Sequence, residues 1–183
     1  AIKLLEPIKL TRRMIISKIS ELFDPCGLWE PIKLQLKLAS SRLSGLSWDQ
    51  MVPEAEQAYL KTNLSEFTGY TNLTARRAPI PADIQSSSYV RLICLSDAGT
   101  NAGGAVVYAG RKYKDGTWSC SMIAAKSKLM KFTIPRNELS AILLMVELGY
   151  LVKKALQNEV SEVIYLTDST IALSWCHNIN RKL

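Results

Sequence analysis

The second half of the chain contains an ordered series of strand-like and helix-like segments, and this order limits the folds open to it. Three apolar or alternating segments come first, and Lys114-Asp115-Gly116 marks a hairpin turn between the second and the third. The expected strands are 89–96, 103–112, 117–126 and 162–167, and the expected helices are 135–156 and 169–177. The order predicts an α/β fold with a mixed sheet of three antiparallel strands, a crossover helix and a parallel strand.

The first part of the chain has a different pattern and predicts a mainly helical segment. Thr11 is placed to cap a helix over 12–23, and a turn-forming run interrupts that helix at 24–27. Pro31 and Pro53 are each placed to open a further helix, although the alternation in 32–38 also fits a strand. We predict a helical connection segment over 1–70, a polar linker over 71–88 and an α/β domain over 89–183.

The balance of charge indicates the kind of partner. Lys and Arg number 23 against 16 Asp and Glu, which gives a net charge of +7 and suits a polyanion such as nucleic acid. The alternative is a basic surface that serves solubility alone. The four cysteines lack the spacing of a zinc site, and the apolar stretches are too short to span a bilayer. These features predict an intracellular protein, cytoplasmic or nuclear.

Three acidic residues lie at the ends of different predicted elements. Asp97 ends the first strand, Asp168 ends the fourth, and Glu138 lies in the first turn of the long helix, on its apolar stripe. Taken singly, Asp97 fits a turn residue, Asp168 a helix cap and Glu138 a favourable charge at a helix start. Together they can converge, and three clustered carboxylates suit Mg²⁺ or Mn²⁺. The strand before Asp168 is nearly all apolar, which predicts burial on both faces.

Basic residues cluster before the long helix. Lys126, Lys128 and Lys131 precede Thr133, where they are placed either to contact phosphates or to form a solvated loop. We predict nucleic-acid contacts at five positions: Lys126, Lys128, Lys131, Arg136 and Ser169.

Five motifs follow one another in the second half of the chain: Leu95-Ser96-Asp97-Ala98, Gly104-Ala105-Val106-Val107-Tyr108, Ala124-Ala125-Lys126-Ser127, Thr133-Ile134-Pro135-Arg136-Asn137-Glu138-Leu139 and Thr167-Asp168-Ser169-Thr170-Ile171-Ala172-Leu173-Ser174-Trp175. In this order they resemble the ribonuclease H-like domain of BEL/Pao long-terminal-repeat retrotransposon polyproteins. The upstream runs around Asp24 and Trp48 resemble the segment between polymerase and ribonuclease H in the same polyproteins.

The resemblance implies a ribonuclease H fold that hydrolyses the RNA strand of an RNA–DNA hybrid with two Mg²⁺ ions. It implies that Asp97, Glu138 and Asp168 are three of four metal-binding carboxylates, with catalytic roles. The fourth acid of the family lies on a later helix, and this sequence stops at Leu183. We therefore expect a domain truncated at its C-terminus, and nuclease activity if a fourth acidic ligand is supplied beyond Leu183. The implied partners are nucleic acid, the rest of the polyprotein and another protein subunit.

Two other functions are compatible with parts of the sequence. One is a non-catalytic module, derived from a retroelement, that binds nucleic acid or serves as a protein scaffold. The other is an ATPase, because Asp97-Ala98-Gly99-Thr100 resembles the phosphate loop of actin-like and sugar-kinase enzymes. That class needs a second phosphate loop, which the sequence lacks.

Overall fold

The computed structural model describes residues 10–65, 86–113 and 115–178. The chain divides into two compact units, Ala1–Thr74 and Ala75–Leu183, and each is described by itself. The predicted linker at 71–88 lies mostly outside the described residues.

The first unit is built from three helices, α1 (Arg12–Glu21), α2 (Glu30–Arg42) and α3 (Glu54–Ser65), with a 3-10 turn, η1 (Leu43–Gly45), after α2. The ambiguous segment 32–38 is helical, because Pro31 lies at the helix start and the residues at helical spacing share one buried face. The core of this unit consists of Ile15, Ile32, Leu36, Ala39, Leu43, Val52 and Leu60.

The first helix is shorter than predicted. Thr11 caps it by accepting a hydrogen bond from the Met14 amide, as expected, but the helix ends at Glu21 because Leu22 is extended. Phe23 therefore does not share the buried face of α1, and its side chain is 88% exposed.

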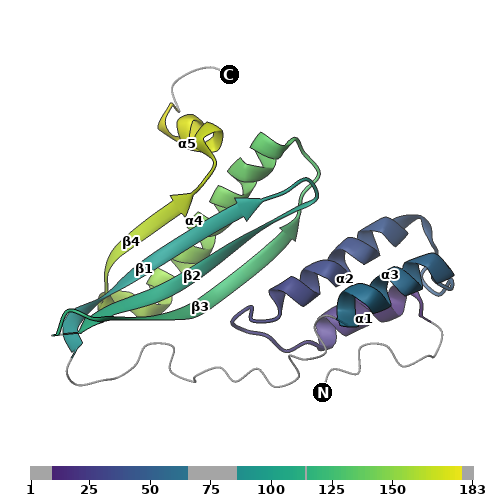
Figure 1. The fold of residues 1–183 in the computed structure, drawn as a ribbon, viewed down its shortest axis with the longest axis horizontal. Helices are drawn as coiled ribbons and strands as arrows, with labels where there is room; N and C mark the ends of the chain where they lie inside the picture. Colours follow the sequence, from purple (N-terminus) through teal and green to yellow (C-terminus); the bar gives the residue numbers. More distant parts are fainter. Residues whose placement is uncertain (1–9, 66–85, 114, 179–183) are drawn as a thin grey trace. The chain divides into compact units, whose positions relative to one another are not determined.

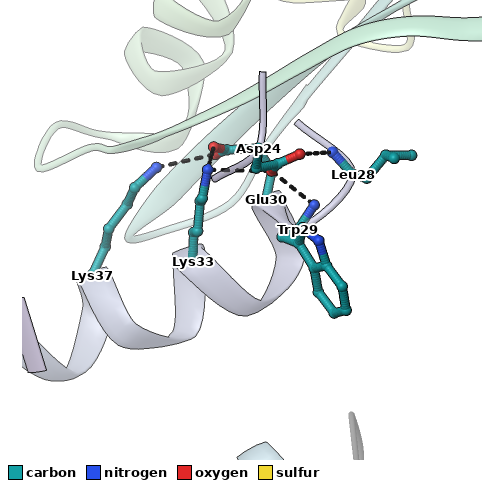
Figure 2. A network of polar contacts seen from close by, with 6 residues as sticks. All are labelled: Asp24, Leu28, Trp29, Glu30, Lys33 and Lys37. Carbon is teal, nitrogen blue, oxygen red and sulfur yellow. Dashed lines mark hydrogen bonds and ion pairs between the residues drawn. The ribbon is translucent and has the colours of Figure 1, made fainter. Parts of the chain in front are cut away.

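A buried carboxylate organises the turn between α1 and α2 (Figure 2). The Asp24 side chain, 1% exposed, accepts hydrogen bonds from the amides of Leu28 (2.7 Å) and Trp29 (2.8 Å) and lies 3.2 Å from Lys33 Nζ. Glu30 lies 3.0 Å from Lys37 Nζ and 3.9 Å from Lys33 Nζ. Each buried charge in this turn therefore has a counter-charge or a backbone donor, as burial requires.

The second unit is an α/β domain with a four-stranded mixed sheet in the order β3-β2-β1-β4. The antiparallel strands are β1 (Ser86–Ala98), β2 (Ala102–Tyr113) and β3 (Trp118–Leu129), and β4 (Val160–Thr167) pairs with β1 in parallel. The crossover is α4 (Ile134–Leu156) followed by the 3-10 turn η3 (Gln157–Glu159), and α5 (Thr170–His177) follows β4 (Figure 1). This topology confirms the predicted fold class.

The long helix α4 covers one face of the sheet. Alternate residues of β1, among them Leu92 and Cys94, are fully buried in the same core as Met145 of α4. Contact is closest at Gly149, where an added Cβ would lie 2.9 Å from Cys94 Sγ and 3.1 Å from Tyr165 Cε1. The absence of a side chain at Gly149 therefore sets how near α4 comes to β1 and β4.

The prediction that the fourth strand is buried on both faces is wrong for the described part of the chain. Tyr165 is 42% exposed and Leu166 is 47% exposed. The reason is topological, because β4 pairs with β1 alone among the described strands and forms an edge of the sheet.

Candidate metal centre and nucleic-acid interface

Two of the three predicted acids are brought together by strand register. In the parallel pair β1–β4, Ser96 is the register partner of Thr167. The next residue along each strand is an acid, Asp97 on β1 and Asp168 directly after β4. Neighbouring strands lie about 4.8 Å apart, so these carboxylates emerge side by side at the C-terminal edge of the sheet.

The third acid comes from α4. Glu138 is the fifth residue of the helix, just beyond the first turn rather than within it, because the helix already begins at Ile134 with Thr133 as its N-cap. Glu138 lies on the stripe that faces the sheet, with Ala141, Ile142 and Met145, and is 9% exposed. Glu138 therefore lies on the core-facing stripe, as expected. The start of α4 places its carboxylate beside the ends of β1 and β4.

The three carboxylates form one cluster. One oxygen from each of Asp97, Glu138 and Asp168 lies within 4.8 Å of the other two. Burial is the main cause that raises the pKa of Glu138, and the negative charges of Asp97 and then Asp168 raise it further. A backbone hydrogen bond from Ala98 acts in the opposite direction. A carboxylate in this position is most stable with positive charge beside it.

The chemistry of the cluster fits a divalent cation. Glu138 Oε2 is buried and has no hydrogen-bond partner in the described part of the chain, which leaves a costly unsatisfied acceptor. Asp97 and Asp168 are exposed, so they can reach a ligand from the solvent side. Because hard oxygen donors suit Mg²⁺ and Mn²⁺, these three residues could hold such an ion.

The helix after Asp168 is capped by a different residue. Ser169 is the N-cap of α5, and its hydroxyl accepts a hydrogen bond from the Ala172 amide at 3.3 Å. The alternative in which Asp168 is the cap is therefore wrong, and its carboxylate belongs to the acid cluster. The predicted nucleic-acid contact of Ser169 would have to be made by a hydroxyl already engaged as an acceptor.

The predicted basic residues occupy exposed positions around the start of α4. Lys126 and Lys128 are on β3, opposite Ala105 and Gly103 of β2, and Lys131 and Arg136 lie just before and within the first turn of α4. Within the described ranges, none of the four forms an ion pair with an acid. Their charge is thus available to a phosphate backbone.

Sequence reasoning missed Asn137, the residue before Glu138. Its side chain is fully buried, and it bonds to the turn between β1 and β2. The signal that could have found it is an amide at i−4 from Ala141, on a stripe that is otherwise apolar. A polar side chain in that position needs partners, and here they come from the loop after Asp97.

Within the described residues, no helix has the length and apolar character needed to cross a membrane.

Comparison with known proteins places these features in a wider context. The family model described as the Pao retrotransposon-like RNaseH-like domain matches residues 11–169. No curated protein matches the chain.

Two solved structures of foamy viral protease-reverse transcriptase are similar to the chain. One, in complex with dsDNA, is 19% identical with a TM-score of 0.41, over 92% of this chain and 35% of the viral chain. The other, described as dRH in complex with dsDNA, is 18% identical with a TM-score of 0.46, over 100% of this chain and 30% of the viral chain. The chain thus spans about a third of the length of these viral proteins.

Proposed function

The chain belongs to the Pao retrotransposon RNaseH-like family, and we propose that it hydrolyses the RNA strand of RNA–DNA hybrids with divalent metal ions. In this proposal it works as part of a retroelement reverse transcriptase polyprotein. The observation that carries the proposal is the meeting of Asp97, Glu138 and Asp168, whose oxygens lie within 4.8 Å of one another.

The three acids have distinct tasks in this proposal. Glu138, held by the buried start of α4 and by the Ala98 amide, is the rigid ligand. Asp97 and Asp168 are both exposed and would face the scissile phosphodiester. Bound Mg²⁺ or Mn²⁺ would supply charge stabilisation at the phosphate and an activated water. The separation of Asp97 and Asp168 is set by the β1–β4 register, so little reorganisation of these two acids is needed on binding.

The hybrid is held by basic residues outside the acid cluster. Lys126 and Lys128 on β3, with Lys131 and Arg136 near the start of α4, offer exposed positive charge without acidic partners in the described ranges. Contacts from these side chains would go to phosphates and not to base edges, so we expect binding without strong sequence preference.

The test is cleavage of a labelled RNA–DNA hybrid with Mg²⁺, Mn²⁺ or EDTA, by the wild-type chain and by Asp97→Asn. We expect cleavage that requires metal and falls by at least about a hundredfold in the variant, as for loss of a group that stabilises a transition state. Two matched variants serve as controls, Asp115→Asn in the exposed β2–β3 turn and Glu147→Gln on the exposed side of α4, and both should cleave normally.

The outcome also separates the enzyme from its alternative. Hybrid binding without cleavage at any metal concentration would refute hydrolysis by the three acids without a fourth ligand, and would favour a non-catalytic nucleic-acid-binding module. Cleavage that persists in EDTA would refute the metal requirement.

A further inference from the structure

Asn137 makes three hydrogen bonds from a fully buried position on α4. Its Nδ2 donates to the carbonyl oxygens of Gly99 (2.9 Å) and Thr100 (3.1 Å), and its Oδ1 accepts from the Phe132 amide (3.1 Å). Both amide protons and the carbonyl are therefore used. The orientation of the amide is unambiguous, because the nitrogen faces two acceptors and the oxygen faces a donor.

These bonds join the turn after β1, the chain after β3 and the start of α4, and two of these segments adjoin an acid of the cluster, Asp97 and Glu138. Gly99 and Thr100 lie in the turn that follows Asp97, and that turn is itself closed by the Gly99 amide donating to the Ala102 carbonyl (2.8 Å). The chain after β3 is tied to the same turn, since the Met130 amide donates to the Asn101 carbonyl (2.9 Å). Asn137 links both to the helix turn that presents Glu138.

Packing alone does not account for an amide at this position. The residues that continue its stripe along α4, Ala141, Leu144 and Met145, are apolar and buried. An apolar side chain would also fill the space, whereas a buried amide is tolerated only with its partners in place. A fully satisfied buried network fixes one relative placement of the parts it joins. Here those parts are the turn after β1 and the start of α4.

We infer that Asn137 is a positioning residue, whose amide locks the 99–101 turn to α4 and so holds Asp97 beside Glu138 at ion-binding separation. This inference rests on the proposed function for its consequence in catalysis. Asn137 touches neither substrate nor ion. Its effect is transmitted through its neighbour Glu138 and through the turn two residues beyond Asp97, and a misplacement of about 1 Å can cost on the order of a hundredfold in rate.

The test compares Asn137→Ala with Met145→Ala, a fully buried residue of the same helix that contacts the core and not the turn. The full chain is used, and Asn137→Ser, a milder change that cannot bridge both carbonyls, serves if the alanine variant does not fold. Three quantities are measured: amide hydrogen exchange at Gly99, Met130 and Phe132, Mn²⁺ affinity by titration calorimetry, and the separate kcat and KM for hybrid cleavage.

We expect Asn137→Ala to speed exchange at these three amides at least about tenfold beyond the Met145→Ala control, because the turn is no longer tied to α4. We expect its Mn²⁺ affinity and kcat to fall by about tenfold to a hundredfold, as for other groups that orient metal ligands, with KM unchanged. The control should lose thermal stability but keep its Mn²⁺ affinity.

Other outcomes are equally informative. Exchange and Mn²⁺ affinity that match those of Met145→Ala would overturn the inference and leave Asn137 as a packing residue. A rise in KM with kcat unchanged would also overturn it, because that pattern indicates lost substrate contact. If the wild-type chain binds no Mn²⁺ while the exchange difference is present, the proposed function fails and the positional role of Asn137 is supported.

Discussion

The helical unit and one edge of the sheet in the α/β unit treat their charged side chains in opposite ways. In the helical unit, most of the described cations are matched with acids, some of them buried or partly buried, as the Asp24–Lys33 and Glu30–Lys37 pairs are. Further pairs there are Arg13–Asp49, Lys18–Glu21 and Arg42–Glu56. Charge in this unit is balanced locally, which indicates that it supports the fold.

The C-terminal edge of the sheet shows the reverse arrangement. Asp97, Glu138 and Asp168 gather without a cation in ion-pair contact, and four basic residues lie around the start of α4 without an acid, within the described ranges. Elsewhere on the same sheet the usual pairing returns, with Arg91 2.9 Å from Glu162. Acids and basic residues are therefore segregated from one another at this one edge of the sheet, and bound charged ligands would stabilise such an edge.

Removal of one acid from each unit should give the largest difference in stability between the two units. Asp24→Ala leaves Lys33 and two amides without their buried partner and should lower the free energy of unfolding by about 3 kcal/mol. Asp97→Ala removes a carboxylate that repels its neighbours and should cost nothing in stability when EDTA is present. Amide exchange in α2 and in β1 measures the two effects. Equal destabilisation by both substitutions would contradict the view that acids support the fold in the helical unit and not at this edge of the sheet.

Removal of two basic residues from each unit tests whether the basic residues near α4 bind nucleic acid. Lys126→Ala/Lys128→Ala should weaken hybrid binding by about tenfold at low salt and reduce the slope of log affinity against log salt by about two. The charge-matched control, Lys18→Ala/Lys37→Ala, removes two cations that face acids in the helical unit and should leave both quantities unchanged. Fluorescence anisotropy across a salt series measures them. The same change in slope in both doubles would mean that binding follows net charge only.

The raised pKa of Glu138 predicts a smaller effect with a definite sign. Because its pKa is higher in the folded state than in the unfolded state, the metal-free protein loses stability as pH rises from the ordinary glutamate pKa through the folded value. Glu138→Gln should therefore melt at a higher temperature than the wild type in EDTA at neutral pH.

That difference in melting temperature should disappear below about pH 4, where the carboxyl is protonated in both states. Added Mg²⁺ should stabilise the wild type and not the variant. A variant that melts below the wild type in EDTA at neutral pH would contradict the assignment of charge repulsion to this cluster.

The smallest effect is expected at the surface of the helical unit. Arg42 Nε lies 3.3 Å from Glu56 and its guanidinium 4.3 Å from the Tyr59 ring centroid, on a partly exposed surface. A double-mutant cycle of Arg42→Ala with Glu56→Ala should give a coupling energy of about 0.5 kcal/mol. A coupling energy several times larger would mean that exposed ion pairs in this unit contribute substantially to its stability.

Sequence reasoning reached the main elements because their signals are local. The turn signal in the sequence at 114–116, the proline at the start of α4 and the apolar runs all lie within a few residues of the elements that they predict. It erred where long-range contact decides the outcome. The end of α1 before Phe23 and the exposure of Tyr165 in β4 both depend on what packs nearby, and hydrophobicity alone does not reveal it.

The candidate site divides in the same way. Asp97, Glu138 and Asp168 were recognisable because each ends or begins an element, and element ends are visible in a single sequence. Asn137 was not, because its partners Gly99 and Thr100 lie 38 and 37 residues away. Ser169 as the cap of α5, in place of Asp168, also depended on the actual start of the helix.

By itself, the sequence determined the order of strands and helices, the family and the placement of three acids at the ends of elements. Only the tertiary structure decided that these acids meet within 4.8 Å, because that distance depends on a parallel register between β1 and β4 and on the close approach of α4 at Gly149. The sequence itself shows which side chains lie at the end of each element. The distance in space between residues 30 to 70 positions apart is set by packing and hydrogen bonds, and these form only when the whole domain folds.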